Sequence, residues 1–189
     1  KLTSAKINVL PIYVDRKKIE EGSINFNLHE RYPWKFILLT VSRLTPEKNI
    51  SFIIDVLRRV QEKFPDTGLI IVGSGPEEKN LKSQVKSLKL EKSVAFVGWQ
   101  DNLTSYYKTA DLYIQTSWFE GYGLALVEAG LSGLPIITTP VGIAQDLKHD
   151  KDAYIYSLNE PELFIMGITD LIKNEEKRKN LAGNIKLTL

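Results

Sequence analysis

The feature that most constrains the fold is an alternation of short apolar runs with segments of helical period, which begins at Lys35. Such alternation is typical of βαβ units, which form a parallel sheet covered by helices on both faces. The sequence therefore predicts an α/β domain with a Rossmann-like, doubly wound parallel sheet of about six strands. The expected strands are residues 36–41, 69–72, 94–97, 112–114 and 135–138, with a shorter sixth at 153–155.

The helical segments between these strands have recognisable ends. Pro65 marks the end of the first, and Pro76 suits the first turn of the second. Asp101 can cap the third helix, and Gly133 follows the fourth. The expected helices are residues 50–64, a segment carrying Leu81, Val85 and Leu88, residues 103–107, residues 124–131, and residues 161–173 with the segment beyond.

The first 34 residues do not show this alternation of strand and helix patterns. Residues 9–15 form an extended apolar stretch, and residues 17–31 are polar and irregular in pattern. A chain of 189 residues suits one domain of ordinary size. We therefore interpret residues 1–34 as an interdomain linker and residues 35–189 as a single domain.

Charge and composition exclude several classes of function. The 25 Lys and Arg residues are scattered among 23 Asp and Glu, so nucleic acid is not an expected partner. The absence of cysteine excludes disulfides, thiolate metal sites and cysteine nucleophiles, and is compatible with a cytoplasmic location. His29 and His149 lie in polar, loop-like contexts, and we interpret both as solvated. No apolar run reaches the roughly 18 residues that a membrane span needs.

Residues that directly follow the strands are the first candidates for a site, because doubly wound sheets bind ligands at the carboxyl ends of their strands. Arg43 and Lys48 follow the first strand, where two cations and a helix N-terminus would suit a diphosphate. The alternative is that both are solvated surface cations. The turn at 73–75 would let backbone approach a ligand, but a plain turn from strand to helix explains it equally well. Residues 97–99 could meet a flat base, but core packing also explains them. The turn at 73–75 also lacks the third glycine of a dinucleotide fingerprint, which disfavours a nicotinamide enzyme.

The segment 118–130 is the most informative part of the chain. Glu128 lies in an otherwise apolar helical segment, where a carboxylate is costly to bury unless hydrogen-bond donors meet it. The vicinal hydroxyls of a ligand would serve, and the alternative is a Glu satisfied by donors within the protein. Glu120 precedes a glycine-containing turn, Gly121 to Gly123, whose N–H groups open the same helix. The segment predicts a site for a small polar or anionic ligand.

With these residues, the sequence resembles glycosyltransferase family 4 and its relatives of the two-domain GT-B fold. The hallmark of that family is a Glu followed after seven residues by a second Glu, with Gly-aromatic-Gly directly after the first. The resemblance covers about residues 36–185. Supporting motifs occur in the expected order at 41–44, 47–49, 71–76, 96–98, 110–113, 133–135 and 140–142. The chain departs from the family at Ile143, Ala144 and Gln145, where many members have a second glycine and then a Glu.

The resemblance implies a role for each matching residue. Arg43 and Lys48 would neutralise the diphosphate of a nucleotide-sugar donor and, with Glu120, form the catalytic set. Glu120 would contact hydroxyls of the transferred sugar, and Glu128 would bind the ribose. The backbone of Gly121, Tyr122, Gly123 and Leu124 would line the phosphates and the sugar. The main chain of Val97 and Gly98 would contact the base. Gly73 and Gly75 would leave room for the nucleotide.

The resemblance also implies the reaction. A UDP- or GDP-linked sugar would be transferred to a hydroxyl of a sugar or lipid-linked acceptor with retention of anomeric configuration, without a metal or other cofactor. We expect the acceptor-binding N-terminal domain and the final crossover helix of the family to lie outside this chain. We therefore expect an inactive fragment of a cytoplasmic enzyme that would contact a membrane only through its missing half. The alternatives are a GT-B-fold sugar-nucleotide epimerase and an inactive, donor-binding regulatory subunit.

Overall fold

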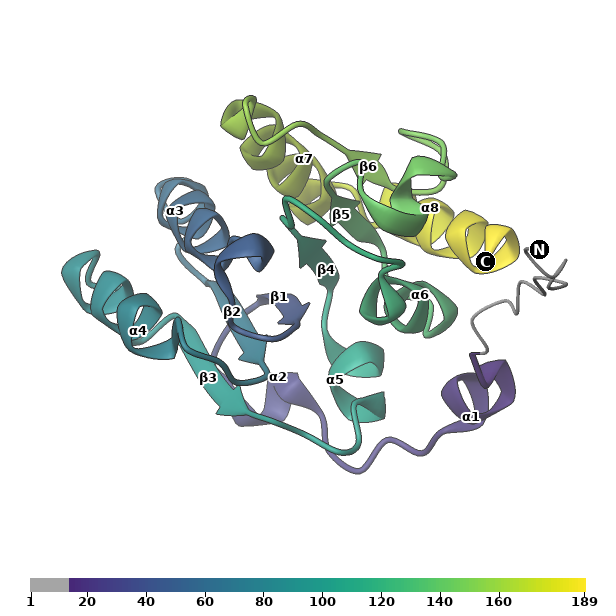
Figure 1. Ribbon diagram of the computed structural model, residues 1–189, viewed down its shortest axis with the longest axis horizontal. Coiled ribbons are helices and arrows are strands. Elements are labelled where there is room, and N and C mark those ends of the chain that lie inside the picture. Colours follow the sequence, from purple (N-terminus) through teal and green to yellow (C-terminus); the bar gives the residue numbers. More distant parts are fainter. Residues whose placement is uncertain (1–13) are drawn as a thin grey trace, which may run out of the picture.

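The computed structural model describes residues 14–189 and has one parallel sheet at its centre (Figure 1). The strand order is β3-β2-β1-β4-β5-β6, so the direction of winding changes between β1 and β4. This arrangement confirms the predicted fold class. Most of the stretch 9–15 that was expected to be extended lies outside the described residues. The strands are β1 (Phe36–Val41), β2 (Thr67–Val72), β3 (Val94–Gly98), β4 (Leu112–Gln115), β5 (Ile136–Thr138) and β6 (Tyr154–Ile155).

Helices cover both faces of the sheet because successive strand residues point to opposite sides. In β1, Phe36 and Leu38 pack with residues of α3, α4 and α7, whereas Ile37 and Leu39 pack with residues of α2, α5 and α6. Figure 1 shows α3 and α4 on one side of the sheet and α5 and α6 on the other. The helices are α2 (Leu28–Arg31), α3 (Ile50–Val60), α4 (Glu78–Ser87), α5 (Thr104–Thr109), α6 (Leu124–Leu131), α7 (Pro161–Lys173) and α8 (Glu175–Thr188), with 3₁₀ turns η1 (Pro46–Lys48) and η2 (Gly142–Gln145).

Three local expectations about helix ends were wrong. Helix α3 ends at Val60, four residues earlier than expected, and a turn then brings Phe64 against the core. Helix α4 begins at Glu78, so Pro76 lies before its first turn. Asp101 does not cap α5, because its carboxylate accepts from the Trp99 indole at 3.2 Å. The N-cap position of α5 is Leu103, and the Asn102 side chain before it accepts a hydrogen bond from the N–H of Thr104 at 2.9 Å.

The expectation of an irregular segment at 17–31 was also wrong. Helix α1 (Arg16–Glu21) begins where the Asp15 side chain accepts from the N–H of Lys18 at 3.0 Å. Helix α2 buries Leu28 completely against the sheet. The Lys108 ammonium donates to the carbonyls of Glu20 and Gly22 at 2.7 and 2.8 Å and so holds the end of α1. The Asp15 cap was the sequence signal for α1, and it was missed.

Both histidines are exposed, as expected, and each ring also has a hydrogen-bonding partner in the fold. His29 Nε2 lies 3.2 Å from the Asp111 carboxylate, which also accepts from the N–H of Ile37 at 2.7 Å. Burial is the main effect on Asp111 and raises its pKa. His149 Nδ1 accepts from the N–H of Ile155 at 3.1 Å. The His29 ring therefore links α2 to Asp111 and, through it, to β1, and the His149 ring links its loop to β6.

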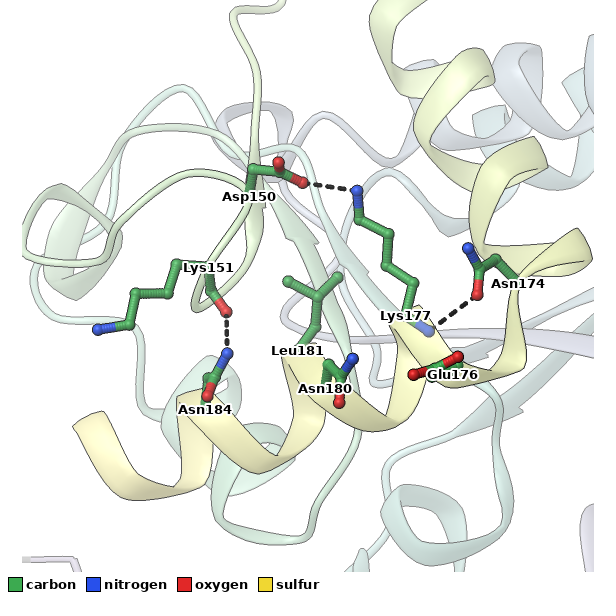
Figure 2. Close-up of a pocket in the computed structure, with 8 residues that line it drawn as sticks. All are labelled: Asp150, Lys151, Asn174, Glu176, Lys177, Asn180, Leu181 and Asn184. Carbon is green, nitrogen blue, oxygen red and sulfur yellow. Dashed lines mark hydrogen bonds and ion pairs between the residues drawn. The ribbon is translucent and has the colours of Figure 1, made fainter.

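Helix α8 is held at the edge of the sheet by polar contacts around a hollow of about 280 Å³ (Figure 2). The Lys177 ammonium lies 2.8 Å from the Asp150 carboxylate, and the Asn174 side chain accepts from the N–H of Lys177 at 3.0 Å. Asn184 donates to the Lys151 carbonyl at 3.0 Å. Because these groups satisfy one another, we assign them a structural role. No helix among residues 14–189 has the length and apolar character needed to cross a bilayer.

Candidate functional site

A cleft of about 570 Å³ opens at the carboxyl ends of β1 and β4, where the winding direction changes. Doubly wound sheets bind ligands at this position. Arg43, Lys48, Glu120 and residues 121–124, all predicted site residues, lie together in its lining. The complete lining is Val41, Ser42, Arg43, Lys48, Trp99, Gln115, Glu120, Gly121, Tyr122, Gly123, Leu124 and Ala125.

Lys48 and Glu120 form an ion pair inside the cleft. Lys48 Nζ lies 2.7 Å from Glu120 Oε2, and the two side chains are only 13% and 12% exposed. The Ser117 hydroxyl donates to the other carboxylate oxygen of Glu120 at 2.7 Å. The alternative that Lys48 is a solvated surface cation is therefore wrong. Its charge is compensated within the protein, and Glu120 and Lys48 fix each other in place.

Arg43 stands at the edge of the cleft with a different environment. Its side chain is 73% exposed, and its nearest carboxylate is that of Glu47, at 3.9 Å. An exposed pair at this distance contributes little to stability. The guanidinium can therefore turn toward an anion in the cleft at small cost.

Backbone contacts join the loop after β1 to the loop after β4. The N–H of Trp118 donates to the Glu47 carbonyl at 2.8 Å. The Thr116 hydroxyl donates to the Asn49 carbonyl at 3.0 Å. Asn49 itself has the left-handed conformation, with φ of 51°, which ends η1 and starts α3. These contacts bring Lys48 to Glu120 although the two residues are far apart in the sequence.

The N-terminus of α6 faces the same cleft through residues 121–124. Gly123 precedes the helix with φ of 102°, a conformation that favours glycine. The first turn of a helix carries N–H groups without intrahelical partners, and these attract anions. The loop is supported from behind, since the N–H of Ile143 donates to the Tyr122 carbonyl at 2.7 Å. Ile143, where the chain departs from the family pattern, thus makes a main-chain contact to the glycine turn.

Glu128 lines a separate hollow of about 500 Å³, which shares Leu124 with the cleft. The rest of its lining comes from α1 with its flanking residues, the loop before α5, α5 itself and Ser132. The Tyr107 hydroxyl donates to Glu128 Oε2 at 3.0 Å, so a protein donor meets one carboxylate oxygen. Burial raises the pKa of Glu128, while the Tyr107 hydrogen bond and the charge of Lys18 oppose this rise. Burial also raises the pKa of Tyr107 well above its usual range, so this phenol stays a neutral donor.

Four predicted site residues, Gly73, Gly75, Val97 and Gly98, lie outside the lining of both hollows. A Cβ at Gly73 would stand 1.9 Å from the Ser42 carbonyl oxygen, and one at Gly75 would stand 2.4 Å from that of Leu44. The N–H of Gly73 donates to the Gly98 carbonyl at 2.8 Å. Neighbouring backbone therefore lies too close for a side chain at either position, which explains why both residues are glycine.

Ser42 and Gln115 line the cleft but were missed in the sequence. The signal for Gln115 was a polar residue at the end of the apolar run 112–114. Within residues 14–189, no group of three or more His, Cys, Asp or Glu side chains is placed to hold a metal ion.

Comparison with known proteins gives a family match over most of the chain. The family model described as "Glycosyl transferases group 1" matches residues 24–188. The chain is 34% identical over 152 residues to an uncharacterised glycosyltransferase of Haemophilus influenzae, and this match covers 79% of the chain and 43% of that relative. The chain thus spans less than half the length of that relative.

Solved structures have the same fold. A crystal structure of Anabaena HepE in complex with UDP and glucose is 28% identical with a TM-score of 0.75, and the match covers 81% of this chain and 43% of that one. The C-terminal domain of a glycosyl transferase group 1 family protein, LpcC, from Francisella tularensis is 22% identical with a TM-score of 0.75. That match covers 91% of this chain and 89% of the domain, and it confirms the fold alone.

Proposed function

Since the chain belongs to the glycosyl transferases group 1 family, we propose that its cleft binds the nucleoside diphosphate and sugar of a nucleotide-sugar donor. The observation that carries this proposal is the convergence of Arg43, Lys48, Glu120 and the N-terminus of α6 on one cleft. Cations and a helix N-terminus suit a diphosphate, and a carboxylate suits sugar hydroxyls. The complex of the similar HepE with UDP and glucose supports the same ligand class.

The roles of the side chains follow from their environments. Arg43 is exposed at the edge and would close on the diphosphate when the donor binds. Lys48 is held by Glu120 and would act from a fixed position. As the bond to the sugar breaks, negative charge grows on the departing diphosphate, and fixed cations lower the barrier by stabilising it. Glu128, in the adjoining hollow, would bind the ribose hydroxyls.

In the whole enzyme we propose that the sugar passes to an acceptor hydroxyl with retention of configuration. The acceptor would be a sugar or a lipid-linked sugar, held by an N-terminal domain across the cleft. No metal is assigned to the reaction, since Arg43, Lys48 and the helix N-terminus would stabilise the leaving group. Residues 1–34 would join the two domains, and the enzyme would act in the cytoplasm.

Calorimetry of the chain with nucleosides, nucleotides and nucleotide-sugars tests the donor site. We expect UDP or GDP to bind more tightly than its monophosphate, and the monophosphate more tightly than the nucleoside. Binding that is equal for all three would contradict the diphosphate site. Product analysis of the whole enzyme would distinguish sugar transfer from epimerisation of the donor, and binding without any product would indicate a regulatory subunit.

A further inference from the structure

Two polar side-chain atoms in the cleft have no hydrogen-bond partner. Four buried side-chain atoms of the described part of the chain lack one: Ser42 Oγ, Thr67 Oγ1, Gln115 Nε2 and Ser132 Oγ. Ser42 and Gln115 both line the cleft, whereas Thr67 begins β2 at the opposite end of the sheet. Buried polar groups in native proteins usually have hydrogen-bond partners, so two such groups without partners in one cleft need an explanation. A ligand that supplies acceptor atoms would explain both.

The backbone places these two residues at the carboxyl ends of neighbouring strands. Ser42 directly follows β1, and Gln115 is the last residue of β4. The strands are parallel neighbours in which Leu39 lies beside Tyr113, so the register brings Val41 to Gln115. The direction of winding changes between these two strands, which is where doubly wound sheets bind their ligands.

The oxygen of the Gln115 amide has a partner within reach. The completely buried Tyr113 hydroxyl lies 3.4 Å from Gln115 Oε1 and 3.4 Å from the Val41 carbonyl, and it can donate to either. Gln115 is 6% exposed, so water has little access to its amide. The Tyr113 hydroxyl lies at the acceptor end of the amide, whereas the donor end, Nε2, has no partner.

We infer that Gln115 Nε2 and Ser42 Oγ donate hydrogen bonds to diphosphate oxygens of the donor, from the floor of the cleft. The neighbouring charged groups favour an acceptor ligand, because Arg43 and Lys48 are cations and α6 presents its N-terminus. The carboxylate of the cleft, Glu120, is occupied by Lys48 and Ser117. Phosphate oxygens accept several hydrogen bonds and so match this set. The inference rests on the proposed donor site and adds two specific contacts to it.

Gln115→Met tests the contact because it keeps the length of the side chain and removes the donor. Affinities for UDP and GDP, their monophosphates and their nucleosides are measured by calorimetry, with a melting curve for each variant. A hydrogen bond to a charged oxygen corresponds to about a tenfold change in affinity or more. We expect that loss for the diphosphate, a smaller loss for the monophosphate and none for the nucleoside.

The melting temperature separates ligand binding from a structural role. Gln115→Met removes an unpaired buried donor, and the Tyr113 hydroxyl keeps the Val41 carbonyl, 3.4 Å away, as an acceptor. The variant is therefore expected to melt at the wild-type temperature or above. Thr67→Val is the matched control, since it removes an unpaired buried hydroxyl outside the cleft and should leave binding unchanged. Ser42→Ala is an independent second variant and should also weaken diphosphate binding selectively.

Each remaining outcome overturns the inference. Equal affinity of Gln115→Met and wild type for the diphosphate would remove Gln115 from the site. A lower melting temperature with equal losses for all ligands would assign Gln115 a structural role. If the wild-type chain binds none of these ligands, the proposed donor site itself fails, and this assignment fails with it.

Discussion

At the scale of single residues, Glu128 is subject to opposing influences on its ionisation. Burial raises its pKa, and the hydrogen bond from Tyr107 lowers it. Only the ionised carboxylate accepts hydrogen bonds from ribose hydroxyls with both oxygens. We therefore predict that affinity for the nucleoside falls as the pH is lowered through the raised pKa of Glu128. Calorimetry with the nucleoside avoids titration of phosphate. Glu128→Gln should bind weakly with no such pH dependence, and an unchanged profile in that variant would contradict the ribose assignment.

Tyr107 positions Glu128 and sets part of its pKa. Tyr107→Phe removes the hydrogen bond that favours the ionised carboxylate. We predict that the pH midpoint of nucleoside binding then moves to higher pH and that affinity at neutral pH falls. Tyr106→Phe is a matched control, because Tyr106 is also buried but packs edge-on against Phe26. A midpoint that stays in place in Tyr107→Phe would show that the phenol has no influence on the carboxylate.

The two cations of the cleft should act on phosphate and not on the nucleoside. We predict that Arg43→Ala and Lys48→Met each weaken diphosphate binding by about 1.5–3 kcal/mol, the usual value for a hydrogen bond to a charged group. The loss should be larger for Lys48, whose position is fixed by Glu120. Arg58→Ala serves as the control, since Arg58 also pairs with a Glu four residues away but lies on α3. Equal losses for diphosphate and nucleoside would contradict the phosphate role.

At the scale of elements, the two glycines before α6 differ in whether their backbone conformation requires glycine. Gly123 has φ of 102°, whereas a Cβ at Gly121 would meet no atom within 4 Å and its φ lies outside the positive range. A Cβ at Gly123 would make an ordinary contact of 3.6 Å with Ile143, so the cost of Gly123→Ala is conformational. We predict a loss of about 1–2 kcal/mol in the free energy of unfolding for Gly123→Ala and almost none for Gly121→Ala. Denaturant unfolding of both variants measures this, and equal stabilities would contradict the strained turn.

Element positions were predictable wherever local pattern and burial agree. The bounds of α6 and α7 matched the expected 124–131 and 161–173, because apolar periodicity and Pro161 are local signals. Helix α1 was missed, although Asp15 caps it. Its position depends on Lys108 and other distant residues, which a local pattern does not contain.

At the scale of the whole molecule, the residues proposed to bind the donor line one cleft of this chain. The chain spans 43% of the Haemophilus influenzae relative. Transfer needs an acceptor hydroxyl held about 3–3.5 Å from the reacting carbon, in a site that excludes water. We predict that this chain alone binds a nucleoside diphosphate weakly and transfers no sugar. Incubation with labelled donor and a panel of sugar and lipid-linked acceptors tests this, and transfer by the chain alone would contradict the need for a second domain.

The sequence by itself determined the order of strands and helices, the parallel sheet and the spacing of Glu120 and Glu128, because these follow from local periodicity and composition. Tertiary structure alone decided which groups meet. It paired Lys48 with Glu120 across 72 positions, placed Glu128 in an adjoining hollow, and left Gln115 Nε2 and Ser42 Oγ without partners in the lining of the cleft. It also showed that Gly73 and Gly75 make room for backbone. Side-chain contacts between distant loops depend on strand register and on the reversal between β1 and β4, and neither is encoded in any local stretch of the chain.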